Sequence, residues 1–130
     1  MRFDQIHEAI LYEIEVGIIK IYKADRELTD HNVNKAADAL VRHYTADLKG
    51  RKHPKIRLTD LEQKVYDHLQ SVCENWMEKE GEGYDQYDKP LIIDCLKRIQ
   101  KSIRLWTTDY GMHGYLNFIE RSVTVTLDED

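Results

Sequence analysis

The side chains best suited to chemistry are the six histidines, because imidazole binds metals and exchanges protons near neutral pH. Helical proteins with two-metal sites carry Glu-x-x-His motifs on facing helices, and this chain contains no such motif. The nearest spacing is Asp4-x-x-His7, in which His7 lies near the centre of an apolar helical stripe. Histidines at such positions are mostly core residues that hydrogen-bond within the protein. His7 and His68 are therefore weak candidates for metal ligands, and we expect no cofactor.

A second group of chemically useful side chains lies in the sequence WTTDYGMHGY, residues 106–115, where a predicted helix breaks. Aromatic rings beside a few polar groups, held at the end of a rigid element, are a common lining for small-ligand pockets. The candidate pocket residues are Trp106, Asp109, Tyr110, His113 and Tyr115. The same sequence also fits a plain helix end, with Gly111 as the terminating residue and the aromatic rings completing the apolar face.

Arg26 and His31 are separated by four residues and precede a predicted helix. This Arg-x4-His spacing resembles the Arg-x4–6-His motif of the HEPN helical ribonucleases, a class of similar size. The resemblance implies a helical ribonuclease and rests on this pair of residues alone. We retain it as a minor alternative.

Two groups of basic residues are predicted to form local surfaces. One occupies the connection before the third predicted helix and comprises Arg51, Lys52, Lys55 and Arg57; the other lies on the outer face of the fourth and comprises Lys97, Arg98, Lys101 and Arg104. Leu105 falls among the charges of the second group, where an apolar residue is out of place. Because residues 58–90 carry 9 acidic and 3 basic side chains, the charges favour self-association as a symmetric homodimer.

Nucleophilic catalysis has little support in the sequence. The chain has no Gly-x-Ser-x-Gly motif and no glycine-rich phosphate loop, and the serines Ser71 and Ser102 fall within predicted helices. Cys73 and Cys95 lack the spacing of a zinc or redox motif, so we interpret them as reduced packing residues.

Length and composition limit the class of protein. The 130 residues suffice for one domain, and 42% hydrophobic with 33% charged residues is typical of a soluble globular chain. The net charge of −5 argues against nucleic-acid binding through the overall field, and leaves a local basic patch as the alternative route. Charged residues interrupt every apolar run, so we expect no signal peptide, no membrane span and a cytoplasmic location.

The elements that position these residues are predicted to be helices. Isoleucines recurring at steps of three and four indicate a first helix over residues 3–24. A second helix is capped by Thr29 or Asp30 and ended by Gly50. Its apolar stripe comprises Val33, Ala37, Leu40, Val41, Tyr44 and Leu48.

The third helix begins at Thr59, where Thr59-Asp60-Leu61-Glu62 matches a capping box, and ends near Gly81. The fourth begins at Pro90, which suits a first helical turn, and runs to Tyr110. A short fifth helix is expected around Leu116 and Ile119, followed by an acidic tail over 121–130 that is either a lone strand or frayed.

These patterns predict an all-α fold, an antiparallel bundle of four long helices plus a short C-terminal helix, in a single domain over residues 1–130. Because caps, stripes and loops account for most residues, the leading functional hypothesis is a non-enzymatic protein–protein interaction or scaffold module that acts as a homodimer. The first alternative is a ligand- or metal-binding bundle that uses core histidines.

Overall fold

The computed structural model describes the backbone of residues 3–77, 89–110, 114 and 116–121, and the side chains of residues 8–77, 90–105, 114 and 116–121. Its four long helices are α1 (Phe3–Ala24), α2 (Asp30–Leu48), α3 (Asp60–Met77) and α4 (Lys89–Tyr110). Residues 116–121 are helical as well, and the described residues include no strand. The prediction of an all-α bundle with four long helices and a short fifth is confirmed. The predicted end of the third helix near Gly81 and the tail over 122–130 lie outside the described residues.

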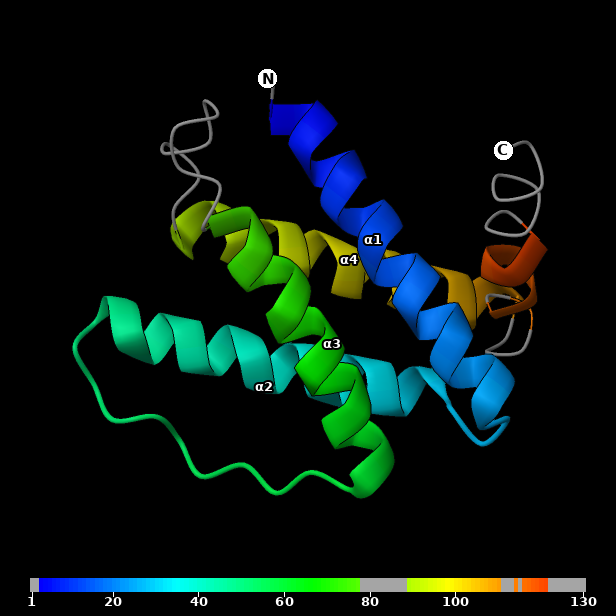
Figure 1. Ribbon diagram of the computed structural model, residues 1–130, viewed down its shortest axis with the longest axis horizontal. Coiled ribbons are helices and arrows are strands. Elements are labelled where there is room, and N and C mark those ends of the chain that lie inside the picture. Colours follow the sequence, from blue (N-terminus) through cyan, green and yellow to red (C-terminus); the bar gives the residue numbers. More distant parts are fainter. Residues whose placement is uncertain (1–2, 78–88, 111–113, 115, 122–130) are drawn as a thin grey trace.

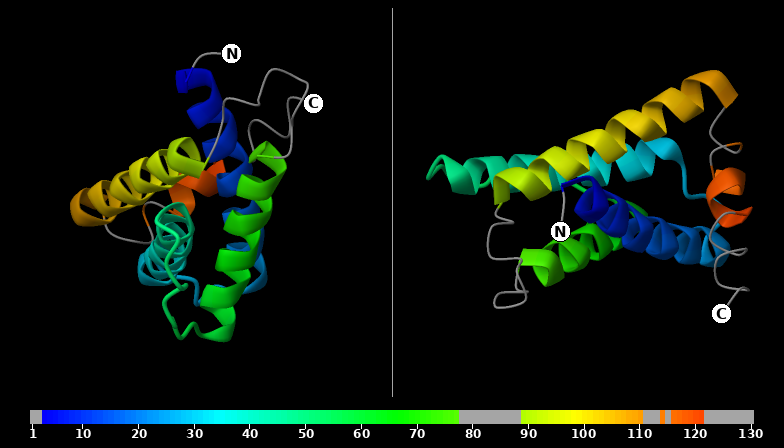
Figure 2. Two further views of the ribbon diagram at one scale, coloured as in Figure 1. Left: turned by 90° about the vertical axis from the view of Figure 1, so that its left-hand side faces the viewer. Right: turned by 90° about the horizontal axis from the view of Figure 1, so that it is seen from above.

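The helices form two antiparallel pairs that cross each other. In Figure 1, α1 and α3 run diagonally in opposite directions, while α2 and α4 run in opposite directions across the molecule behind them. The view from above in Figure 2 shows α2 with α4 as one layer and α1 with α3 as the other. Helix α2 packs against both α3 and α4, and α1 packs against the same two helices. The apolar stripes therefore meet between the layers, in one shared core.

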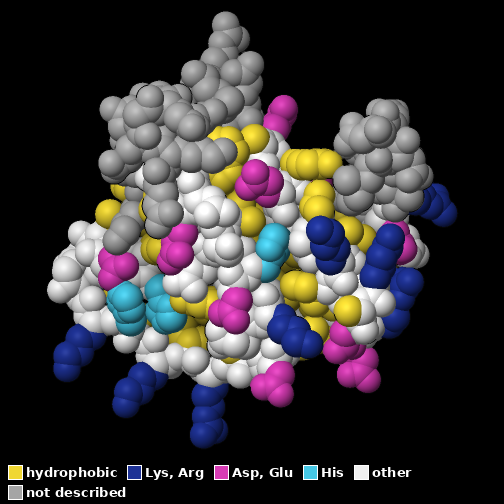
Figure 3. All heavy atoms as spheres, in the orientation of Figure 1, with side chains coloured by type: hydrophobic (Ala, Val, Ile, Leu, Met, Phe, Trp, Pro, Cys, Tyr) yellow, Lys and Arg dark blue, Asp and Glu magenta, His cyan; other side chains and the backbone are white. Residues whose placement is uncertain are grey.

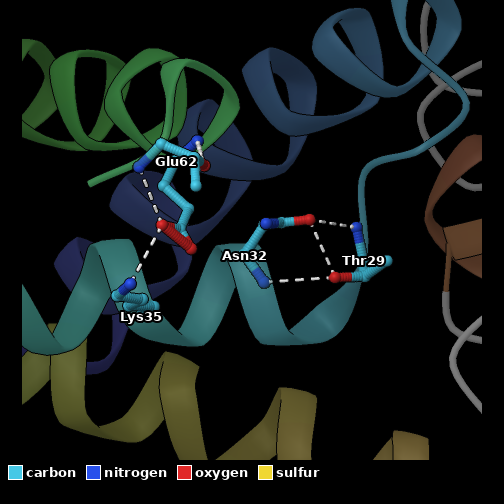
Figure 4. Close-up of polar contacts among 5 residues, drawn as sticks. Thr29, Asn32, Lys35 and Glu62 are labelled. Carbon is cyan, nitrogen blue, oxygen red and sulfur yellow. Dashed lines mark hydrogen bonds and ion pairs between the residues drawn. The ribbon is translucent and has the colours of Figure 1, made fainter. Parts of the chain in front are cut away.

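The start of α2 follows from a local hydrogen-bond exchange. Thr29 is the N-cap: its Oγ1 accepts from the Asn32 N–H at 3.3 Å, while the Thr29 N–H donates to Asn32 Oδ1 at 3.0 Å (Figure 4). Two of the exposed donors at a helix N-terminus are satisfied in this way. Of the two predicted caps, the structure therefore selects Thr29.

The end of α2 is a Schellman motif built around Gly50. This glycine has a φ of 62°, a left-handed conformation that favours a residue without a Cβ. The Gly50 N–H donates to the Asp47 carbonyl at 3.1 Å, and the Arg51 N–H donates to the Ala46 carbonyl at 2.8 Å. The predicted stop at Gly50 is confirmed, and the motif turns the chain back beside α2.

The predicted capping box at the start of α3 is present, and it does more than cap. The Thr59 N–H donates to Glu62 Oε1 at 2.9 Å, and the Glu62 N–H donates to Thr59 Oγ1 at 3.2 Å. Glu62 is only 2% exposed, and Lys35 of α2 places its Nζ 3.2 Å from the same Oε1 (Figure 4). A cap residue thus also joins two helices through an ion pair between its buried carboxylate and the partly exposed Lys35, which the sequence pattern did not predict.

Most of the predicted apolar stripe of α2 is buried, but Leu48 is an exception. Leu48 lies in the last turn of the helix and is 49% exposed, so the prediction of a core position is wrong. Figure 2 shows the end of α2 extending past the start of α4, which explains why Leu48 is exposed although it lies in helical phase with the apolar stripe.

Candidate functional site

The predicted small-ligand pocket falls largely outside the described side chains. Trp106, Asp109 and Tyr110 lie in the C-terminal part of α4, where the structure describes the backbone alone. His113 and Tyr115 are outside the described residues. A pocket formed by these five residues remains a prediction.

The two weak metal candidates have different outcomes. His7 lies in α1, but its side chain is outside the described part. His68 of α3 donates its Nε2–H to the Ile14 carbonyl of α1 at 3.0 Å, and its ring occupies the space above Gly17. His68 is thus a packing residue between two helices. Among the side chains that the structure describes, no three His, Cys, Asp or Glu residues converge in a metal-binding group.

A pair of histidines that the sequence analysis did not single out as partners lies beside the C-terminal half of α2. The rings of His43 and His53 stack with their centroids 5.1 Å apart. His53 Nε2 contacts the Asp47 carboxylate, while His43 contacts the Tyr66 hydroxyl through Nδ1 and the Pro54 carbonyl through Nε2, the latter at 3.3 Å. Because only an N–H can donate to a carbonyl, the proton of neutral His43 is on Nε2, and Tyr66 donates to Nδ1.

These histidine contacts attach the connection between α2 and α3 to the helices. Residues 51–59 contain no regular secondary structure, yet their His53 and Pro54 are both bonded to α2. Figure 3 shows two histidine side chains next to each other on this face, with Lys and Arg side chains projecting from the edge below them. The spacing of the residues contained no signal for this contact, since it depends on how the connection folds back.

Arg26 and His31, the pair that resembles the ribonuclease motif, have separate surroundings. The Arg26 guanidinium lies 4.5 Å from the centre of the Tyr22 ring and places its Nη1 3.6 Å from Glu120 of the short helical segment 116–121. His31 is exposed in the first turn of α2. Arg26 therefore lies between the end of α1 and the C-terminal segment, in contact with a residue of each.

The predicted interaction surface on α4 is solvent-facing. Its members Lys97, Arg98, Lys101, Arg104 and Leu105 are all exposed, and the Leu105 side chain is 57% exposed. Arg98 Nε lies 3.3 Å from Asp94 Oδ2, one turn earlier on the same helix. An exposed pair of this kind contributes little to stability, so it leaves the character of the surface basic.

Residues of both predicted basic surfaces line one groove: Arg51 and Lys52 come from the connection, and Lys97 comes from α4. The groove has a volume of about 310 Å³ and lies between the C-terminal half of α2, the start of the connection and α4. Its apolar part is contributed by Val41, Ala46 and Pro54, with Thr45 beside them. Five basic residues complete the lining: Arg42, Lys49, Arg51, Lys52 and Lys97. We call this feature the basic groove.

The positive charge of the basic groove is largely uncompensated. Arg42 pairs with Asp38 at 3.0 Å, one turn earlier on α2. Within residues 8–77 and 90–105, no carboxylate lies within ion-pair distance of the other four basic side chains, which are all exposed. The basic groove is therefore a local concentration of positive charge on a chain whose net charge is −5.

The two thiols are unsuited to nucleophilic chemistry. Cys73 of α3 and Cys95 of α4 are fully buried and free. Burial raises the pKa of the Cys73 thiol to about 12 and that of the Cys95 thiol to about 11, so the reactive thiolate is scarce at neutral pH. Their interpretation as packing residues agrees with these positions in the core.

None of the helices in the described part of the chain combines the length and the apolar character that crossing a membrane requires. Comparisons of the chain with protein-family models, with curated proteins and with solved structures found no match.

Proposed function

We propose that the protein is a non-enzymatic protein–protein interaction module that acts as a homodimer through the outer face of α4. The observation that carries this proposal is Leu105, a large apolar side chain that is 57% exposed on a face whose neighbours are basic. Exposed leucines are common singly, but one beside several basic side chains keeps apolar surface in water, and contact with a partner would remove that surface from water.

Charge complementarity supports a second copy of the chain as the partner. Residues 58–90 carry 9 acidic and 3 basic side chains, whereas the outer face of α4 carries Lys97, Arg98, Lys101 and Arg104. In a two-fold symmetric dimer the same contact occurs twice, so one copy's basic face can meet the other's acidic part. Such pairs chiefly provide orientation and speed of association, while Leu105 supplies apolar area.

The size of the apolar contribution follows from the exposed fraction of Leu105. Complete burial of a leucine side chain stabilises by ~1.5–3 kcal/mol, so covering the exposed 57% is worth roughly 1 kcal/mol in each copy. Losing it in both copies raises the dimer Kd about thirtyfold. A lysine at this position has the further effect of repelling the neighbouring basic side chains.

The test is sedimentation equilibrium of the wild-type protein and two matched variants. Leu105→Lys is expected to be monomeric at concentrations where the wild type is a dimer. Leu48→Lys is the control, since Leu48 is also an exposed leucine, at 49%, but lies at the end of α2. A monomeric wild type, or equal weakening by both variants, would overturn the proposal.

The alternative functions have less support from the described residues. His43 and His68 use ring nitrogens for contacts with Tyr66, Pro54 and Ile14, which leaves them poorly placed as metal ligands. The ribonuclease alternative requires Arg26, whose guanidinium is already engaged by Glu120. We place the protein in the cytoplasm, because free thiols are typical of a reducing compartment.

A further inference from the structure

We infer that the basic groove is a binding site for a small ligand that carries two or more linked phosphate groups. The site shares Lys97 with the basic face of α4 but does not include Leu105, and a single copy of the chain supplies its whole lining. Two stretches of the chain that are distant in the sequence provide its cations. Arg42 of α2, the C-cap residue Lys49, and Arg51 and Lys52 of the connection form one, and Lys97 of α4 is the other.

The wall of the groove formed by the connection is held in place before any ligand arrives. The Arg51 N–H donates to the Ala46 carbonyl at 2.8 Å within the Schellman motif, which sets the direction in which the chain leaves α2. Beyond it, His53 contacts Asp47, and the Pro54 carbonyl accepts from His43 at 3.3 Å. The backbone that carries Arg51 and Lys52 is thus attached on both sides, so a ligand has less ordering entropy to overcome.

The type of lining favours phosphate over a single carboxylate. Arginine offers a planar fork of N–H donors that matches two oxygens of a phosphate, and lysine adds a compact charge. Arg51, Lys49, Lys52 and Lys97 have no carboxylate partner within the described residues, so binding an anion does not require breaking an ion pair there. Four such groups can neutralise several negative charges at once. A ligand with a single carboxylate carries only one negative charge and so leaves most of these cations unpaired.

The dimensions favour a small molecule. A volume of about 310 Å³ lies at the lower end of the range for small-molecule sites, which begins at roughly 300 Å³. Val41, Ala46 and Pro54 provide an apolar part of the lining that an organic group attached to the phosphates can contact. The cations are exposed, so each contact is weak and screened by salt, and a ligand with several phosphates is needed for measurable affinity.

The experiment is isothermal titration calorimetry of the full chain at low salt, with tripolyphosphate and ATP as the probes. Both are expected to bind, and both affinities should fall as salt is added. Tighter binding of ATP would identify an organic phosphate as the ligand class, since only ATP can use the apolar lining. Equal affinities would identify the phosphate chain alone. Absence of heat with both probes would overturn the inference.

Two double variants provide a control of equal charge. Arg51→Gln with Lys52→Gln removes two cations of the groove, whereas Lys55→Gln with Arg57→Gln removes one lysine and one arginine of the same connection that do not line it. The first is expected to weaken tripolyphosphate binding roughly tenfold, and the second to change it less than twofold. Equal losses would show general attraction to a basic loop and contradict a defined site.

A single variant tests whether α4 contributes to the site. Lys97→Gln should weaken binding, while Lys64→Gln, which removes an exposed lysine of α3 outside the groove, should not. Circular dichroism of each variant confirms that the helices are retained. A single-stranded DNA oligonucleotide is titrated in parallel: if it binds more tightly than ATP and all variants weaken it equally, the surface is an extended nucleic-acid interface and the small-ligand inference is wrong.

Discussion

Replacing Gly17 by alanine provides a sharp test of how α1 and α3 pack. A Cβ at position 17 would lie 2.0 Å from both Cε1 and Nε2 of His68, and 2.5 Å from its Nδ1. The imidazole therefore fills the place of the missing side chain, and the added methyl group forces the ring to leave or the helices to separate. In leaving, His68 would also lose its hydrogen bond to the Ile14 carbonyl, which is 3.0 Å long.

Two opposing effects determine the magnitude. Alanine is more favourable than glycine inside a helix by roughly 1 kcal/mol, so at an open position the substitution would stabilise the protein. Against this, the lost hydrogen bond costs about 1 kcal/mol, and overpacking costs a further ~1–3 kcal/mol if the ring is not fully displaced. We expect Gly17→Ala to lower the free energy of unfolding by roughly 1–3 kcal/mol.

The assay is urea denaturation, followed by circular dichroism, of a double-mutant cycle. His68→Ala empties the space above Gly17, so in that background Gly17→Ala should stabilise the protein through its helix propensity. The sign of the same substitution therefore reverses, and the coupling between the two positions is about 2–4 kcal/mol. If Gly17→Ala stabilises the wild-type protein, or has the same effect in both backgrounds, the packing of His68 on Gly17 is refuted.

Three further substitutions test the polar groups of the core. Burial acts to raise the pKa of the Glu62 carboxyl, but hydrogen bonds from Thr59 and the ion pair with Lys35 outweigh it and hold that pKa below its ordinary value of 4.5. These contacts stabilise the folded protein above pH 4.5, and their stabilisation is lost as the pH falls through the lowered pKa. Glu62→Gln should be less stable than wild type by ~1–3 kcal/mol near neutral pH. In urea titrations below pH 4.5 this difference should shrink, and a difference independent of pH would contradict the stabilising role of the Glu62 carboxylate. The buried Tyr44 hydroxyl has no hydrogen-bond partner within the described residues, so Tyr44→Phe should leave the thermal midpoint unchanged or raise it. Tyr66→Phe is its matched comparison and should cost about 1 kcal/mol, because it removes the contact with His43, and equal midpoints for the two variants would argue against this difference.

Local sequence determined the helices and their ends. The repeat of isoleucines in α1 predicts a helix over 3–24, and the structure has it from Phe3 to Ala24. Thr59 with Glu62 and Gly50 were recognised as helix boundaries because a cap is made within a few residues of the chain. Leu48 shows the limit of this reasoning: helical phase defines a face, but whether the face is covered depends on how far the neighbouring helices extend.

Tertiary structure alone decided which of these residues meet. The sequence separates Lys97 from Arg51 by 46 positions, yet both line one groove because α4 packs against α2 and the Schellman motif returns the connection to that helix. The stacking of His43 on His53 and the fit of His68 on Gly17 arise in the same way. Residue types and spacing carry information about neighbours along one element, where geometry repeats every 3.6 residues. Contacts between elements depend on crossing directions and on the length of each helix, which follow from packing the whole core at once.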